Sequence, residues 1–274
     1  KEISHLASIA QPTLGYISNY GKAHLQGFGG VEGIIKGKSE LYDYIAQTAE
    51  GIALVNAEDA IQLEKSTACR RTTFGKTNAQ FTYIIEEKDE FACIQFSTSK
   101  ESYDIHSNLS GSFNCTNLAA AVALGRHFDV PAPSIVQALT DYVPAMNRVE
   151  WRKTASNRVL LDAYNANPTS MSLSIENFTK WHKDGWLVLG DMFELGKESA
   201  AEHQAIVELV QRTNMEKRCV LVGKHFGSTT WQNLQFATTG DLETYWKENG
   251  APKDAAILLK GSRGIALEQL LPLL

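Results

Sequence analysis

The stretch LDAYNANPTSM, residues 161–171, is the most informative part of this chain for its fold and for a candidate ligand-binding edge. It follows an apolar run, Arg158 to Leu161, that is typical of a buried strand. Pro168 and Thr169 then open a helix, because proline fits the first helical turn, where its missing N–H would be unpaired anyway. Open parallel sheets bind ligands at such strand-to-helix corners. One acid, one phenol and two carboxamides favour a binding edge here, and a solvated Asx-type turn is the alternative.

The residues after about position 147 alternate regularly between strands and helices. Apolar runs predict strands near residues 159–161, 186–189, 219–222 and 257–259. The segments between them predict helices near residues 169–181, 200–212 and 242–248. This alternation is typical of a parallel, doubly wound sheet, so we place a domain boundary at about residue 147.

The residues before that boundary mix two kinds of strand pattern. Apolar runs typical of buried strands lie at residues 13–18 and 52–55, and helical spacing of apolar residues covers 33–46. An alternation typical of antiparallel strands covers residues 81–85, 91–96 and 103–106. Two further helices are expected near residues 114–128 and 133–142.

The composition describes an ordinary globular protein. The 274 residues, 43% hydrophobic and 21% charged, suffice for two domains with a sizeable core. A net charge of -5 argues against a general nucleic-acid surface, and no apolar run approaches the roughly 20 residues that span a bilayer. Four scattered cysteines without a C-x-x-C pair disfavour metal or disulfide frameworks and fit a reducing cytoplasm.

The chain begins at Lys1, which is neither an initiator methionine nor the start of a signal peptide. It also lacks a G-x-x-x-x-G-K-[ST] loop, whose backbone and lysine hold ATP phosphates. We therefore expect a fragment of a longer protein, and we expect the fragment by itself to be inactive as an ATP-dependent enzyme.

Further polar residues lie where predicted elements begin or end. His24 follows a strand in a glycine-rich loop, where a neutral imidazole can bind a divalent cation or simply lie at the surface. Asn114 starts a predicted helix and would be a good N-cap. Arg148, at the interdomain linker, has a guanidinium that suits bidentate phosphate contact. Asp191 ends one strand, and residues 260–263 end another and open a helix whose backbone N–H groups are available to an anion.

These segments together resemble the Mur ligases, specifically the type that adds D-alanyl-D-alanine to UDP-N-acetylmuramoyl-tripeptide. Residues 162–168 resemble the motif Asp-Ser-Tyr-Asn-Ala-Asn-Pro. Residues 19–29 resemble Asn-x-Gly-x-Ala-His-Leu-Glu-Gly-Phe-Gly, with Gln26 in place of the glutamate. Residues 111–117 resemble Gly-x-His-Asn-x-x-Asn, with Phe113 in place of the histidine.

The resemblance continues to the end of the chain in the same order. Residues 190–196 match Gly-Asp-Met-x-Glu-Leu-Gly, His203 matches a trailing histidine, and residues 260–263 match Lys-Gly-Ser-Arg. The resemblance implies a partial central α/β domain of the ATPase type in residues 1–146. It implies a Rossmann-like, doubly wound C-terminal domain in residues 147–274.

The resemblance also implies a role for each matching side chain. His24 and Lys38 would bind Mg2+, the lysine as a carbamate, because a desolvated lysine near cations is nucleophilic and magnesium prefers oxygen ligands. With Asp162 they are the expected catalytic residues. Asn114, Arg148 and Asp162 would hold ATP. The dipeptide and ligation side would be lined by Asn165, Asn167, Asp191, Lys260, Ser262 and Arg263.

The implied reaction is amide ligation in peptidoglycan synthesis through an acyl phosphate, with UDP-N-acetylmuramoyl-tripeptide and D-Ala-D-Ala as substrates. We expect a cytoplasmic monomer without nucleic-acid or membrane partners. Two alternatives stay open: a Mur-type ligase for another amino acid, and a non-catalytic nucleotide-binding module. The run YNANP at residues 164–168 argues against the diaminopimelate or lysine adder, which carries an Asp-Asn-Pro-Arg type of motif.

Overall fold

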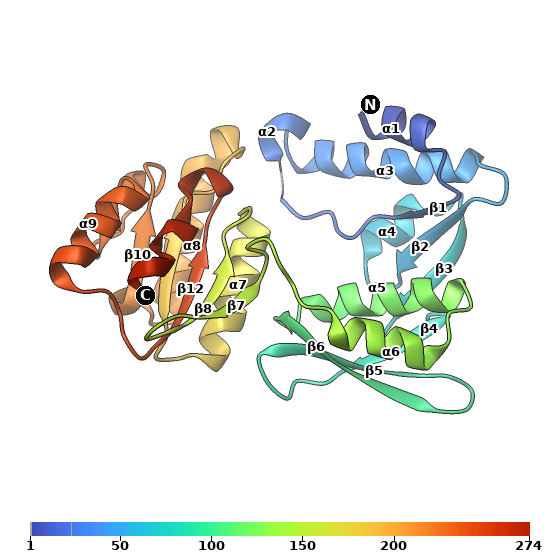
Figure 1. Cartoon of the computed structure of the whole chain (residues 1–274). Coiled ribbons are helices and arrows are strands. Elements are labelled where there is room, and N and C mark those ends of the chain that lie inside the picture. Colours follow the sequence, from blue (N-terminus) through green and yellow to red (C-terminus); the bar gives the residue numbers. More distant parts are fainter. Residues whose placement is uncertain (1, 23) are drawn as a thin grey trace. The chain divides into compact units, whose positions relative to one another are not determined.

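The chain forms two compact units in a computed structural model, which describes residues 2–22 and 24–274 (Figure 1). The first unit contains residues 2–21, 27–108 and 112–142, and the second contains residues 22, 24–26, 109–111 and 143–274. The domain boundary at residue 147 stays a prediction. Among the described residues, no helix is both long enough and apolar enough to cross a membrane.

The first unit is built on a six-stranded sheet whose strands are ordered as in the sequence. They are β1 (Leu14–Tyr16), β2 (Ile52–Asn56), β3 (Arg70–Gly75), β4 (Phe81–Ile85), β5 (Phe91–Ser97) and β6 (Ser102–Ser110). The first three strands are parallel, and β4 pairs antiparallel with β5. The alternating pattern therefore predicted the antiparallel pair correctly, whereas β3, which has charged and threonine residues in four of its six positions, was not predicted.

The helices of the first unit include the two that carry expected site residues, α3 and α5. The helices are α1 (Glu2–Ala10), α3 (Val31–Gln47), α4 (Ala60–Lys65), α5 (Asn114–His127) and α6 (Ala132–Asp141). The short helix α2 (Leu25–Phe28) has its first two residues in the second unit and its last two in the first. The side chains of Tyr42 and Ile45 on α3 pack into a core with Ala53 and Val55 of β2. This packing fixes which face of α3 is turned away from the sheet, and it leaves Lys38 half-buried.

The second unit is a six-stranded sheet with parallel central strands, as the alternation of elements predicted. The strand order is β11 (Gln235–Phe236), β10 (Cys219–Val222), β9 (Trp186–Gly190), β12 (Ala256–Lys260), β8 (Arg158–Asp162) and β7 (Glu150–Lys153). All neighbours are parallel except β7, which is antiparallel to β8. The edge strands β7 and β11 are short and were not predicted from the sequence.

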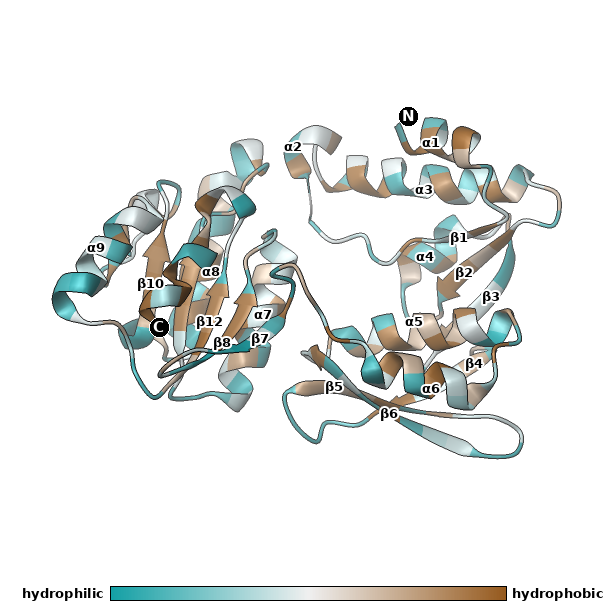
Figure 2. Cartoon of the chain, viewed as in Figure 1, coloured by the Kyte–Doolittle hydropathy of each residue, from teal (hydrophilic) through white to brown (hydrophobic). Residues whose placement is uncertain are grey.

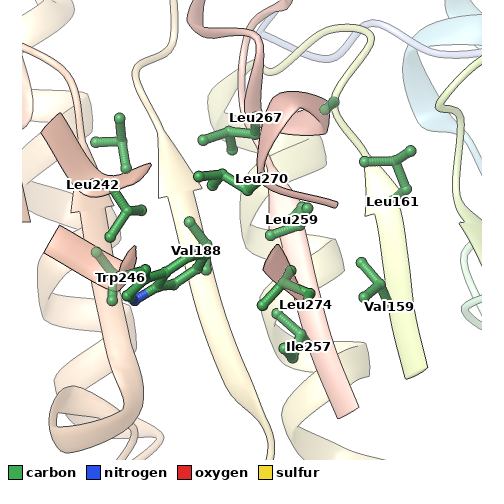
Figure 3. Close-up of a cluster of buried hydrophobic side chains, with 13 residues drawn as sticks. Val159, Leu161, Val188, Leu242, Trp246, Ile257, Leu259, Leu267, Leu270 and Leu274 are labelled. Atoms are coloured by element: carbon green, nitrogen blue, oxygen red, sulfur yellow. The ribbon is translucent and has the colours of Figure 1, made fainter. Parts of the chain in front are cut away.

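Helices and apolar side chains cover this second sheet. The helices are α7 (Pro168–Trp181), α8 (Ser199–Arg212) and α9 (Thr239–Asn249). Thirteen buried residues form one cluster in which strand residues such as Val188 and Leu259 pack against Trp246 of α9 and the C-terminal Leu270 (Figure 3). Consecutive residues of β8, Val159 to Leu161, are at most 3% exposed, so both faces of the sheet are covered. Hydrophobic residues are concentrated in the central strands (Figure 2).

Candidate functional site at the strand ends

The carboxyl ends of β8 and β12 bring together two charged residues. Asp162 and Lys260 are the last residues of these strands and are directly opposite each other in the parallel register. Asp162 Oδ2 forms an ion pair with Lys260 Nζ and accepts a hydrogen bond from Ser174 Oγ at 3.0 Å. The Lys260 side chain is 1% exposed and that of Asp162 11%. The turn at residue 162 is therefore not merely solvated, and its carboxylate is held in a fixed orientation.

The two asparagines of the following turn have different surroundings. Asn167 is the N-cap of α7. Its side chain accepts a hydrogen bond from the Ser170 backbone N–H at 2.9 Å, and Ser170 Oγ accepts one from the Asn167 backbone N–H at 3.2 Å. Asn165 is exposed, and its Oδ1 accepts the N–H of Ala166 at 2.9 Å. Asn167 thus orients the helix, while the Asn165 side chain lies at the surface. Contact of either residue with a substrate stays a prediction.

Tyr164, in the same turn, is flanked by two arginines. The guanidinium carbon of Arg148 lies 4.0 Å from the centroid of the Tyr164 ring, and that of Arg263 lies 5.3 Å from it. Both distances are in the range of cation–π attraction. The structure therefore brings together an arginine expected to contact nucleotide and one expected to contact the dipeptide. Sequence reasoning gave Tyr164 no role, since an aromatic in a turn carries no signal of what covers it.

Asp191 follows β9 and holds the neighbouring loop after β10. It is 2% exposed, and its two carboxylate oxygens accept the backbone N–H groups of His225 at 2.9 Å and Phe226 at 3.0 Å. Gly223 lies beneath it with φ 131°, and a Cβ there would be 2.1 Å from Asp191 Cγ. The carboxylate thus accepts its hydrogen bonds from the protein's own backbone and lies 3.6 Å from His203 Nε2, and the expected substrate contact stays a prediction.

His203 of α8 supports the loop that begins at Asp191. It is fully buried; its Nε2 accepts the Met192 N–H at 3.0 Å, and its Nδ1 donates to the Ser199 carbonyl at 2.7 Å. These partners require a neutral ring with its proton on Nδ1, and burial lowers the pKa of His203 accordingly. Sequence reasoning matched this residue to a motif without assigning a role, and the structure makes it a support for the strand-end loop.

Ser262 connects the ends of β9 and β12. Its Oγ accepts the Phe193 N–H at 3.0 Å, and its own N–H donates to the Asp191 carbonyl at 3.1 Å. It is 3% exposed, whereas its neighbour Arg263 is exposed. The expected ligation-side residues therefore divide into buried ones that shape the edge and exposed ones that face solvent.

The two expected magnesium ligands belong to different units. Lys38 is on α3 in the first unit, where Nζ donates to the Asn19 carbonyl at 2.8 Å and burial lowers the pKa of the amine. His24 groups with the second unit, has φ 55° and contacts the Glu194 carboxylate through Nδ1. Within the described ranges, no group of three or more His, Cys, Asp or Glu side chains is arranged to hold a metal.

Asn114 is the first residue of α5, and the N-cap is Phe113. The interpretation of Asn114 as the N-cap is therefore wrong, because the helix begins one residue earlier than that role requires. Asn114 is 6% exposed and its Oδ1 accepts a hydrogen bond from Asn117 Nδ2 at 2.9 Å. A role in binding adenine stays a prediction.

Two family models match this chain and together cover most of it. The Mur ligase middle domain matches residues 1–125, and the Mur ligase, glutamate ligase domain matches residues 147–263. The chain belongs to the Mur ligase family.

Within that family the similarity is to the MurF type. The UDP-N-acetylmuramoyl-tripeptide–D-alanyl-D-alanine ligase of Escherichia coli K12 is 30% identical over 98% of this chain and 61% of its own length. The ligase of the same name from Bacillus subtilis is 28% identical over 98% of this chain and 60% of its own length. A crystal structure of MurF from Acinetobacter baumannii, 29% identical, superposes with a TM-score of 0.83 over 98% of this chain and 60% of that one. The chain thus spans about three fifths of these relatives.

A more distant solved structure confirms the fold. MurF from Thermotoga maritima, solved in complex with ADP, is 21% identical and has a TM-score of 0.83 over 99% of this chain and 64% of that one. The predicted α/β fold class is confirmed by these likenesses.

Proposed function

We propose that this chain is part of a cytoplasmic, monomeric, ATP-dependent ligase that joins D-alanyl-D-alanine to UDP-N-acetylmuramoyl-tripeptide in peptidoglycan synthesis. The observation that carries the proposal is the set of polar side chains at the carboxyl edge of the second sheet. They follow one another in the order of the MurF-type motifs, and Asp162 and Lys260 meet there as a buried pair. That the 274 residues alone are inactive stays a prediction.

The proposed reaction has two steps in which atoms balance. The terminal phosphoryl group of ATP is transferred to the tripeptide carboxylate, which gives ADP and an acyl phosphate. The amine of D-Ala-D-Ala then attacks the acyl carbon, the C–O bond to phosphate breaks, and the amide forms with loss of a proton and phosphate. Both steps need groups that hold phosphoryl oxygens, because charge develops on them in the transition state.

The proposed roles of the chain's residues follow from their surroundings. Asn114, Arg148 and Asp162 hold the nucleotide, and exposed Asn165 and Arg263 contact the dipeptide or the reacting carboxylate. Three buried residues of the edge, Asp191, Lys260 and Ser262, and the half-buried N-cap Asn167 make mainly internal contacts and keep that surface in shape.

Magnesium would be held in part by residues of the first unit. When bound, the ion would neutralise phosphate charge. The half-buried amine of Lys38, whose pKa is lowered by burial, suits conversion to a carbamate, and a carbamate offers the oxygen atoms that Mg2+ prefers. The small number of protein ligands also fits, since Mg2+ usually keeps several waters and phosphate oxygens. We propose His24 as a further ligand.

The proposal is tested with the whole protein, MgATP, UDP-N-acetylmuramoyl-tripeptide and D-Ala-D-Ala. We expect ADP and a tripeptide–dipeptide product in equal amounts, measured by coupled ADP release and mass spectrometry. Reactions without the tripeptide, or with L-Ala-L-Ala, are the controls. A product formed from diaminopimelate or lysine and the acceptor that lacks the third residue, supplied in a parallel reaction, would identify another Mur-type ligase. Nucleotide binding without turnover would identify a binding module.

A further inference from the structure

Two arginines from distant parts of the chain meet at one aromatic ring in the second unit. Arg148 precedes β7, and Arg263 follows β12, yet both guanidinium groups lie within cation–π range of Tyr164. The ring is thus the structural element that these two cations share.

The two positive charges have no anionic partner in the part of the chain that the structure describes. Both side chains are exposed, and their side-chain interactions are the two contacts with the ring. Like charges close together repel each other, so the arrangement gains stability when an anion joins it. Planar guanidinium groups suit phosphoryl oxygens in particular, because each can donate two parallel hydrogen bonds.

The backbone next to Arg148 is also held in an unusual conformation. Asn147 and Val149 have φ values of 60° and 54°. Such values are rare for a β-branched residue and persist where the surroundings impose them, often at binding sites. The Asn147 carbonyl accepts the backbone N–H of Tyr164 at 3.2 Å. The segment that carries Arg148 is therefore tied to the residue whose ring Arg148 covers.

We propose that Tyr164 is a positioning residue that holds Arg148 and Arg263 around one phosphoryl group, so that the two guanidinium groups act as a single clamp. This inference rests on the proposed function and refines it, because the two arginines were expected to serve nucleotide and dipeptide separately. The phosphoryl group belongs either to ATP or to the acyl phosphate.

The first test is direct binding of inorganic phosphate to the 274-residue chain, followed through the 15N-labelled arginine Hε signals of Arg148 and Arg263. We expect both signals to titrate with one shared Kd, and both to lose their ring-current shift in Tyr164→Leu. Two different Kd values, or a response of one arginine alone, would overturn the clamp. If MgATP competes with inorganic phosphate, the clamped phosphoryl group belongs to the nucleotide. If phosphate still binds when MgADP is bound, the group belongs to the acyl phosphate. Either result supports the clamp.

The second test measures ligation by the whole protein. Tyr164→Leu should lower kcat at least tenfold with little change in melting temperature, whereas Tyr164→Phe keeps the ring and should retain most of the activity. Trp181→Leu removes the ring of another cation–π pair, with Lys180 at the far end of α7, and is the matched control. If Tyr164→Phe and Tyr164→Leu lower kcat equally, the inference is overturned.

Double-mutant cycles separate this inference from the proposed function. Arg148→Ala and Arg263→Ala should be non-additive in the wild-type background and nearly additive with Tyr164→Leu. If neither arginine substitution affects ligation, their proposed roles fail. If both impair ligation while Tyr164→Leu behaves like the wild type, only the positioning role of Tyr164 fails.

Discussion

Lys260 and Asp162 are 98 residues apart in the chain, yet they are opposite partners at the ends of β12 and β8 and form a buried ion pair. Neither charge could be buried alone, because removing an ion from water is costly unless a partner and hydrogen bonds compensate. Ser174 supplies a further hydrogen bond to the carboxylate from α7. The pair therefore links two strands and one helix at the edge where we propose that the ligands bind.

Asp162→Asn should impair both nucleotide use and folding. We expect nucleotide use to weaken by about 1–3 kcal/mol, the size of a lost hydrogen bond to a charged group. Because Lys260 would keep a buried, unpaired charge, we also expect a loss of about 3 kcal/mol in the free energy of unfolding. ATP kinetics and urea unfolding of one preparation measure the two effects. The double variant Asp162→Leu/Lys260→Met is the control and should recover much of the stability; a failure to do so would show that the charges do not act as a pair.

Lys38→Ala should nearly abolish ligation in the whole protein, and bicarbonate or a small carboxylic acid should restore part of it. Lys36→Ala is the matched control, since Lys36 is an exposed lysine on the same helix. A lowered pKa leaves more of the Lys38 amine neutral. With 13C-bicarbonate we therefore expect a carbamate signal that increases as the pH rises toward the ordinary pKa of a lysine amine. Wild-type rates in Lys38→Ala would place the residue outside the reaction.

Acidification should destabilise the protein through His203. The pKa of the folded state is lowered by burial, so the unfolded state binds the proton more readily. The stability contribution is therefore complete above the ordinary pKa of about 6.5 and is lost as the pH falls through the range below it, by at most about 1.4 kcal/mol per pH unit. Asp191, Glu202 and His225 face the ring and modulate the effect.

Urea unfolding of the wild type and of His203→Gln at pH 7.5 and 5.5 checks this prediction. We expect the variant to have a smaller free energy of unfolding than the wild type at pH 7.5. We also expect that free energy to decrease less in the variant when the pH falls to 5.5. Equal losses in both proteins would mean that other groups cause the acid sensitivity.

Gly223→Ala should be strongly destabilising, by about 3 kcal/mol or more, because it combines a positive φ with a clash in a packed site. The added Cβ would lie 2.1 Å from Asp191 Cγ and would displace the carboxylate that holds His225 and Phe226. Gly240→Ala, in α9, is the control: its nearest neighbour would be Thr238 Oγ1 at 3.8 Å, and we expect it to be neutral or slightly stabilising. Similar melting temperatures for both variants would contradict the prediction.

Elements with strong local signals could be predicted closely. The strand at 219–222 and the helix behind Pro168 agree with β10 and α7 to within one residue, because a run of apolar residues and a helix cap depend on neighbours in the chain. The edge strand β7 was missed, because its residues Glu150 to Lys153 have no apolar alternation and pair only through the neighbouring β8.

The sequence by itself determined the two α/β patterns, the motif order and the residue types at each strand end, since these depend on local periodicity and on chemistry written along the chain. Only the tertiary structure decided which of those residues meet. The pairing of Asp162 with Lys260 needs the parallel register of β8 and β12, and the gathering of Arg148 and Arg263 at Tyr164 needs the second sheet to be complete. Contacts between residues far apart in the chain arise from packing and register, which no local pattern of residues encodes.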